Sequence, residues 1–213
     1  MWRLFLAVIM ATVGGDAWAD DFIPLGAPDF RPSMERPFGW RGDGTGRFPG
    51  ATPVTDWSET ENVRWSANVG SSYSSPVLAE QFVFVLSEPG LLVCLRRADG
   101  ALRWKLALTP DGLADPDVRK VVADYKPPKD GSGFAAATPV TDGRNVYVLL
   151  ANGLLCAVDF EGHRLWSAGI TAPPGTGYGR SASPIIAGDY FMIISDQGFG
   201  NCFEASSGKF AAL

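Results

Sequence analysis

The residue types that most often perform catalysis form no recognisable arrangement in this chain, and its aspartates and glutamates are scattered along it. His163 is the sole histidine, and it follows Glu161 in a turn, where a solvent-exposed side chain is expected. General acid–base catalysis needs a partner group in a concave site, and the sequence indicates neither. No Gly-x-Ser-x-Gly nucleophile elbow is present. We therefore predict no catalytic residue.

The three cysteines, Cys94, Cys156 and Cys202, do not have the spacing of a metal site. Cys-x-x-Cys is absent and only one histidine could assist, so we predict no metal-binding residue. An odd number of cysteines leaves at least one unpaired. Each cysteine precedes a glycine by six residues, which places all three in the same strand of a repeat. We predict sulfurs too far apart to bond, acting as small buried apolar groups between repeats.

Anion and nucleic-acid binding are poorly supported. The stretch Gly175–Gly179 is rich in glycine, but it lacks the lysine and the strand–loop–helix context of a phosphate loop, which favours a connector. Arg180 follows it and is a candidate for lining a molecular face. The net charge is −5 and no basic run is present, which argues against a nucleic-acid partner.

The repeated unit into which these residues are set is seen most clearly in the stretch Ala137–Trp166. A Thr-Pro-Val step opens it, and three turns at Asp142-Gly143, Asn152-Gly153 and Glu161-Gly162 separate its β-rich runs. Asn-Gly and Asp-Gly supply the positive φ angles of tight hairpins. The stretch therefore predicts a four-stranded meander that ends at Trp166.

This unit recurs on both sides with nearly constant spacing. Each copy has a small residue followed by proline, two apolar runs, a late glycine and, in the first two copies, a tryptophan. The shared positions are Pro76, Pro139 and Pro184, then Gly100, Gly162 and Gly208, then Trp104 and Trp166. Four strands in a repeat of this length are typical of propeller blades. We therefore predict an all-β partial β-propeller of about three four-stranded antiparallel blades, over 74–108, 137–170 and 181–213.

The remaining segments are assigned around these blades. Asn62–Gly70 is predicted to be a lone ring-closing strand in which Trp65 has the place of the blade tryptophans. Residues 20–61, rich in proline and glycine, form an extended lead-in before the repeats of 62–213. Residues 109–136 are an insertion between blades with a possible helix over Asp117–Tyr125.

The N-terminus has the pattern of a secretory signal. Arg3 supplies a positive charge, Leu4–Val13 is an apolar segment too short to span a bilayer, and Ala17-Trp18-Ala19 is a cleavage site. Residues 1–19 are therefore predicted to be a signal peptide. The expected location is periplasmic or extracellular, with no transmembrane segment after cleavage.

At the positions shared by the repeated copies, the chain resembles the PQQ-like β-propeller repeat family, which includes the assembly lipoprotein BamB and quinoprotein dehydrogenases. Its second copy has Ala157-Val158-Asp159, Gly162 and Trp166, as the family repeat does. The other copies depart from the pattern, with Arg96 at the aspartate position of the first and Ala212 at the tryptophan position of the third. The resemblance implies that Trp65, Trp104 and Trp166 pack between blades.

Two functions follow from the resemblance. One is an exported, non-enzymatic binding or scaffold module whose partner is a protein or the missing blades of the same propeller. The other is a fragment of a PQQ-dependent quinoprotein oxidoreductase, in which calcium and PQQ would be the cofactors. The chain lacks both the cysteine of a BamB-type lipid anchor and the adjacent Cys-Cys pair of many PQQ-dependent alcohol dehydrogenases. We therefore expect the first function, with no cofactor.

Three copies are fewer than the four to eight blades of closed propellers. The strand around Trp65 has no blade of its own, and the third copy ends at its outermost strand. The sequence is therefore expected to be part of a longer or split propeller. Its terminal blades should expose apolar faces, so that it self-associates when expressed alone.

Overall fold

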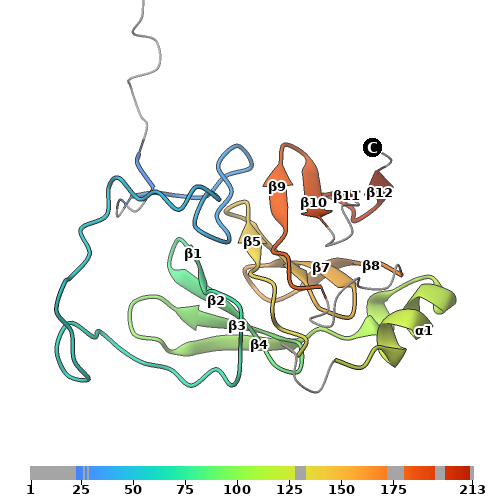
Figure 1. Ribbon diagram of the computed structural model, residues 1–213, viewed down its shortest axis with the longest axis horizontal. Coiled ribbons are helices and arrows are strands. Elements are labelled where there is room, and N and C mark those ends of the chain that lie inside the picture. The colour runs from blue at the N-terminus through green and yellow to red at the C-terminus, as the bar shows by residue number, and fades with distance from the viewer. Residues whose placement is uncertain are drawn as a thin grey trace, which may run out of the picture.

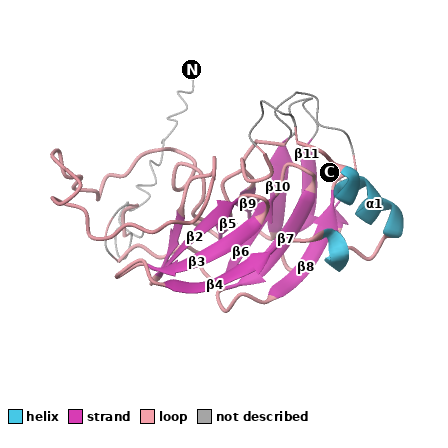
Figure 2. Cartoon of the chain, turned by 90° about the horizontal axis from the view of Figure 1, so that it is seen from below, coloured by secondary structure: helices cyan, strands magenta, loops and turns pink. Residues whose placement is uncertain are grey.

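The computed structural model describes residues 23–25, 27, 29–127, 133–171, 180–194 and 200–211. These residues form three four-stranded antiparallel sheets, and within each sheet every strand pairs with its neighbour in sequence. Figure 1 shows the sheets stacked one after another, and Figure 2 shows them from below as a fan of strands. The sheets do not close into a ring. The predicted all-β partial propeller of three blades is therefore confirmed.

Each sheet is one blade, and its strands run in order from the inner edge of the fan to the outer edge. Blade 1 contains β1 (Val77–Ala79), β2 (Phe82–Ser87), β3 (Leu91–Arg96) and β4 (Leu102–Ala107). Blade 2 contains β5 (Val140–Thr141), β6 (Asn145–Leu149), β7 (Leu154–Asp159) and β8 (Arg164–Gly169). Blade 3 contains β9 (Ile185–Ala187), β10 (Tyr190–Ile194), β11 (Gly200–Glu204) and β12 (Phe210–Ala211).

The hairpins of blade 2 form at the predicted Asp-Gly and Asn-Gly turns. Gly143 has a φ of 87° and Gly153 a φ of 89°, which side-chain-bearing residues rarely adopt. The Gly153 amide donates to the carbonyl of Leu150 at 2.9 Å and closes the turn between β6 and β7. Turn chemistry therefore fixes the register of this blade.

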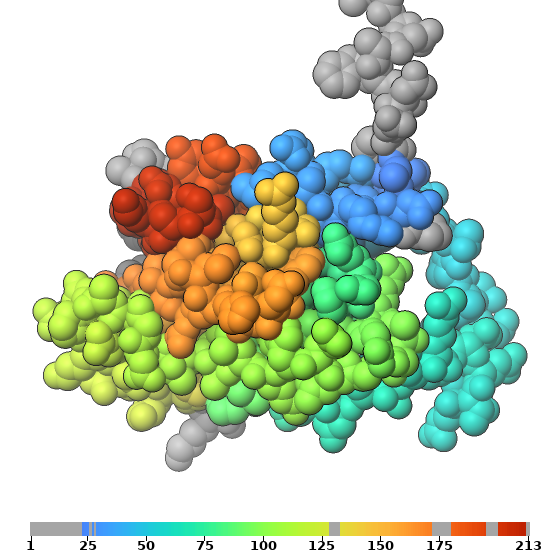
Figure 3. Space-filling model, turned by 180° about the vertical axis from the view of Figure 1, so that it is seen from behind, coloured from blue at the N-terminus to red at the C-terminus, as the bar shows by residue number. Residues whose placement is uncertain are grey.

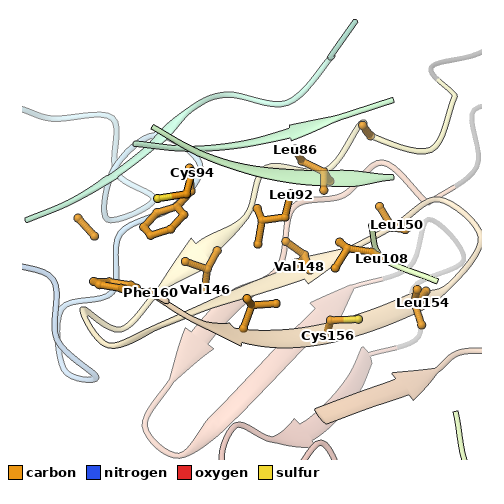
Figure 4. Packing of buried hydrophobic residues seen from close by; sticks show 14 of the residues in the cluster. Leu86, Leu92, Cys94, Leu108, Val146, Val148, Leu150, Leu154, Cys156 and Phe160 are labelled. Atoms are coloured by element: carbon orange, nitrogen blue, oxygen red, sulfur yellow. The ribbon is translucent and has the colours of Figure 1, made fainter. Parts of the chain in front are cut away.

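Two apolar cores lie between the blades. Figure 4 shows the first, in which Leu86, Leu92 and Cys94 of blade 1 face residues of blade 2. The second joins blade 2 to blade 3 through side chains that include Tyr147 and Phe191. Because blade 2 is covered on both faces, alternate residues of β6 and β7 are buried on both sides. Blade stacking thus explains strands without a polar face.

The insertion between blades 1 and 2 contains the 3₁₀ turn η1 (Pro110–Gly112) and the helix α1 (Pro116–Asp124). The Asp115 carboxylate accepts hydrogen bonds from the amides of Asp117 at 2.8 Å and Val118 at 3.3 Å, and so caps the first turn. Val118 packs so closely on Gly169 of β8 that a side chain there would clash. The helix therefore packs on the outer strand of blade 2.

The expected ring-closing strand differs from what the structure shows. Residues 62–70 form no strand, and none of the described strands pairs with them. Trp65 and Val69 nevertheless pack on Val83 and Val85, which form the face of blade 1 turned away from blade 2. The segment thus covers that face through side chains and not through sheet pairing.

The cysteines all lie in the third strand of a blade, but they are not equivalent. The residues that face each other across the second and third strands are Phe84 and Cys94, Tyr147 and Ala157, and Met192 and Cys202. Ala157 therefore has the place that cysteine has in the other blades, and Cys156 points to the opposite face. The turn after β7 is one residue shorter than those after β3 and β11, which makes the spacing from cysteine to glycine equal by coincidence.

The described residues of the lead-in form no named helix or strand, but the segment is docked on the blades. Phe38 forms an antiparallel bridge with Thr141 of β5, and Leu25 is buried at 3% exposure. Figure 3 shows the blue lead-in against the yellow-orange residues of blade 2. The predicted signal peptide lies outside the described residues. In the part of the chain that is described, no helix is long and apolar enough to cross a membrane.

Candidate functional site

The small residue before each proline links one blade to the next. The Ser75 amide donates to the Thr138 hydroxyl oxygen at 3.0 Å, and the Thr138 amide donates to the Ser183 hydroxyl oxygen at 3.0 Å. Pro76, Pro139 and Pro184 follow these residues, directly before the inner strands β1, β5 and β9. Proline has no amide to donate at a strand edge. The small-residue–proline step therefore builds a line of hydrogen bonds at the inner edge of the blades.

Each described blade tryptophan packs on the late glycine of the following copy. The indole N–H groups of Trp65, Trp104 and Trp166 donate at 2.8–2.9 Å to the carbonyls of Arg97, Phe160 and Ala205, in that order. A Cβ on Gly100, Gly162 or Gly208 would stand 2.5–2.9 Å from the indole ring. The tryptophans and glycines that define the repeat thus pack each copy against the next, as the family resemblance implies for the tryptophans.

The thiols of Cys94 and Cys156 are poor nucleophiles at neutral pH. Burial raises the pKa of Cys94 to about 12, and burial also raises the pKa of Cys156. All three cysteines are buried and free, and none forms a disulfide. A raised pKa keeps a thiol protonated and therefore a poor nucleophile.

We expect Cys94 and Cys156 to resist labelling by Ellman's reagent at pH 8 in the folded chain. With a pKa near 12, on the order of one Cys94 thiol in ten thousand would be ionised. Complete labelling should appear only in denaturant, and the time course of absorbance measures this. Rapid labelling of either residue in the folded chain would contradict this account of their burial.

His163 lies in an exposed turn, as predicted. Its ring Nδ1 is 2.9 Å from Oδ2 of Asp159, and its backbone amide donates to Oδ1 at 2.7 Å. Burial alone would raise the pKa of Asp159, but these hydrogen bonds lower it. The pair closes the hairpin between β7 and β8. The contact therefore gives both side chains a structural role in this turn.

Arg180 binds carbonyl groups of blade 2. Its guanidinium donates to the carbonyls of Ala151 at 3.1 Å and Ile170 at 3.2 Å. These contacts fix the chain where it enters blade 3. The preceding stretch Gly175–Gly179 lies outside the described residues.

A cavity of about 860 Å³ lies between the lead-in and the turns of blades 2 and 3. Asp142 on its wall accepts from the Tyr147 hydroxyl at 2.8 Å and from the amides of Arg144 and Asn145 at 2.8 and 2.7 Å. Burial, followed by the contact with Asp142, raises the pKa of Tyr147. These bonds use the carboxylate to fold the turn. No group of three potential metal ligands occurs among the described residues.

A second cavity, of about 450 Å³, is the stronger candidate for a binding site. It lies where the inner strands of the three blades begin, and Ser75, Thr138 and Ser183 lie on its wall. The apolar part of the wall is formed by Trp40, Tyr73, Ile185, Met192 and Ile194. Trp40 comes from the lead-in, and the last three come from blade 3. The cavity thus combines hydroxyl groups with exposed apolar side chains.

Sequence reasoning did not identify this site. Trp40 lies within the predicted lead-in of residues 20–61, and no periodic pattern connects it to blade 3. The usable signal was the alternation Tyr190, Met192, Ile194, which matches covered positions in the earlier blades.

Comparisons with known proteins agree on the repeat. The family profile described as outer membrane protein assembly factor BamB matches residues 50–198. BamB from Moraxella catarrhalis is 21% identical, with a TM-score of 0.49, over 69% of this chain and 41% of that chain. Quinohemoprotein alcohol dehydrogenase ADHIIG from Pseudomonas putida HK5 is 20% identical, with a TM-score of 0.50, over 70% of this chain and 21% of that chain.

At 20% identity, the likeness to the dehydrogenase structure supports a shared fold and nothing further. The chain spans less than half the length of either structure. No curated protein sequence matches the chain.

Proposed function

The chain belongs to the BamB family of β-propeller repeat proteins, and we propose that it is an exported, non-enzymatic binding module for a protein partner. Family membership supports the repeat architecture, while the partner and the location are parts of the proposal. Export rests on the N-terminal pattern of Arg3, Leu4–Val13 and Ala17–Ala19. The remaining support comes from the surface of blade 3.

The observation that carries the proposal is the open apolar face of this blade. Ile185, Tyr190 and Ile194 are 50%, 45% and 61% exposed. On the matching faces of the earlier blades, Phe84 and Tyr147 are buried beneath the next blade. Contiguous apolar surface of this kind marks contacts with other polypeptides. The occupant is a second protein or further blades of the same propeller.

Photo-cross-linking in the producing cells tests this proposal. A photoreactive residue in place of Ile194 should give one discrete adduct with a protein that mass spectrometry identifies and that the purified chain then binds reversibly. The matched control is Leu165 on β8, which is 52% exposed but lies at the outer edge of blade 2. The absence of any adduct at Ile194, or the same adducts at both positions, would refute the proposed binding face.

The alternative, a part of a quinoprotein oxidoreductase, leads to a different prediction. Under the proposed function, the purified chain should bind neither PQQ nor calcium at stoichiometric level. Equilibrium dialysis with both ligands, followed by a dye-linked alcohol oxidation assay, measures this. Tight binding or PQQ-dependent turnover would favour the oxidoreductase.

A further inference from the structure

The lead-in adds a strand-like contact to the inner edge of blade 2. The Phe38 amide donates to the Thr141 carbonyl at 2.9 Å, and the Thr141 amide donates to the Phe38 carbonyl at 2.9 Å. This reciprocal pair is the hydrogen-bonded pair of an antiparallel ladder. In Figure 1 the blue lead-in passes beside β5. The inner edge of a blade in this chain therefore accepts an extended segment.

The neighbouring residues hold that segment in place. A Cβ on Gly39 would stand 3.1 Å from the Pro139 carbonyl and from Val140, so that the backbone lies flat against the edge. Gly39 and Gly42 exchange hydrogen bonds of 2.7 and 3.0 Å, which close a tight turn. Trp40 is at the tip of this turn, and the guanidinium carbon of Arg41 lies 4.3 Å from its ring centroid. The anchored turn thus places an aromatic ring on the wall of the 450 Å³ cavity.

The inner edge of blade 3 lies beside the same cavity and has no such occupant. β9 pairs with β10, and no described residue pairs with its other edge. Ile185 of β9 and Ile194 of β10 line the cavity together with Trp40. A free strand edge next to a partly apolar cavity is the combination used in strand addition, in which backbone bonds give affinity and side-chain pockets give selectivity.

We infer that the cavity and the inner edge of β9 form a strand-addition site for an extended segment of a partner polypeptide. The segment pairs with β9 as Phe38 pairs with Thr141, and one of its apolar side chains enters the cavity between Trp40 and Ile194. Because side chains alternate along a strand, apolar residues at every second position would face the cavity. This inference rests on the proposed binding function and specifies the form of the ligand.

A defined peptide tests the inference with the full chain. The probe is a fluorescein-labelled nonapeptide in which leucine, valine and leucine alternate with threonines between terminal lysines. Fluorescence anisotropy should show saturable binding. A peptide of equal composition without the alternation should bind at least about tenfold more weakly, and a version N-methylated at the central valine should bind more weakly by up to about tenfold. N-methylation removes one ladder hydrogen bond, which changes affinity by up to about that factor.

Two matched variants locate the site. Ile194→Asp should weaken binding of the alternating peptide at least about tenfold, whereas Leu165→Asp should leave it within about twofold. Both side chains are exposed, and unchanged thermal melts would establish that both variants fold. Equal binding of the alternating and rearranged peptides, or an equal loss in both variants, would overturn the inference.

The peptide result also separates this inference from the proposed function. Absence of peptide binding together with a specific adduct at Ile194 would refute strand addition and leave the binding module standing. Absence of both would refute both.

Discussion

Replacing Gly162 by alanine is expected to lower the free energy of unfolding by about 3 kcal/mol. The φ of 95° at this residue costs a side-chain-bearing residue about 1–2 kcal/mol. The added Cβ would stand 2.9 Å from the Trp104 ring, so the indole must move away from its packing and from the Phe160 carbonyl. Loss of that hydrogen bond adds about 1 kcal/mol.

Gly188 provides the matched control for this substitution. Its φ is 57°, and no atom lies within 4 Å of the position of a Cβ. Gly188→Ala should therefore cost only the backbone term of about 1–2 kcal/mol. Urea unfolding of both variants measures the difference. Equal losses would show that the contact between tryptophan and glycine does not hold the blades together.

Truncation of Phe84 to alanine is expected to have a still larger effect, a loss of about 3–5 kcal/mol. The ring is fully buried between blades 1 and 2. Its centroid lies 5.0 Å from that of Phe160 across the blade boundary and 5.9 Å from that of Trp104. Removal of the ring leaves a cavity in the interface that stacks the two blades.

Phe210→Ala is the corresponding control on the outer strand of blade 3. Phe210 is 64% exposed, so its truncation should cost less than about 1 kcal/mol. Thermal unfolding of the two variants under one set of conditions gives the comparison. A small loss for Phe84→Ala, similar to that for Phe210→Ala, would mean that blades 1 and 2 are not packed as described.

The blades were predictable because local and long-range signals agree in them. Asp142-Gly143 and Asn152-Gly153 specify hairpins by their own backbone preferences, and the apolar runs between them are buried on both faces. Repetition then multiplied the signal over three copies. The orientation of Cys156 was not predictable from its spacing to Gly162. The turn after β7 is one residue shorter than the matching turns of the other blades, so a strand residue counted back from the glycine falls on the opposite face.

The candidate site was not predictable for a different reason. The contact between Phe38 and Thr141 joins segments about one hundred residues apart through backbone atoms alone, and backbone pairing leaves no mark in residue type. Trp40 acquires its position from that contact. The segment around Trp65 shows the reverse case, because its tryptophan was recognisable although the expected strand does not form.

Hydroxyl-radical footprinting of the full chain, at a dilution at which light scattering shows it to be monomeric, tests the central claim most directly, namely that two blade interfaces are closed and the equivalent face of blade 3 is open. Side chains are oxidised according to their exposure, and mass spectrometry reads each position. We predict rapid oxidation of Tyr190 and Ile194, with Phe84 and Tyr147 protected. Protection of Tyr190 and Ile194 to the level of Tyr147, or oxidation of Phe84 at the rate of Tyr190, would contradict it.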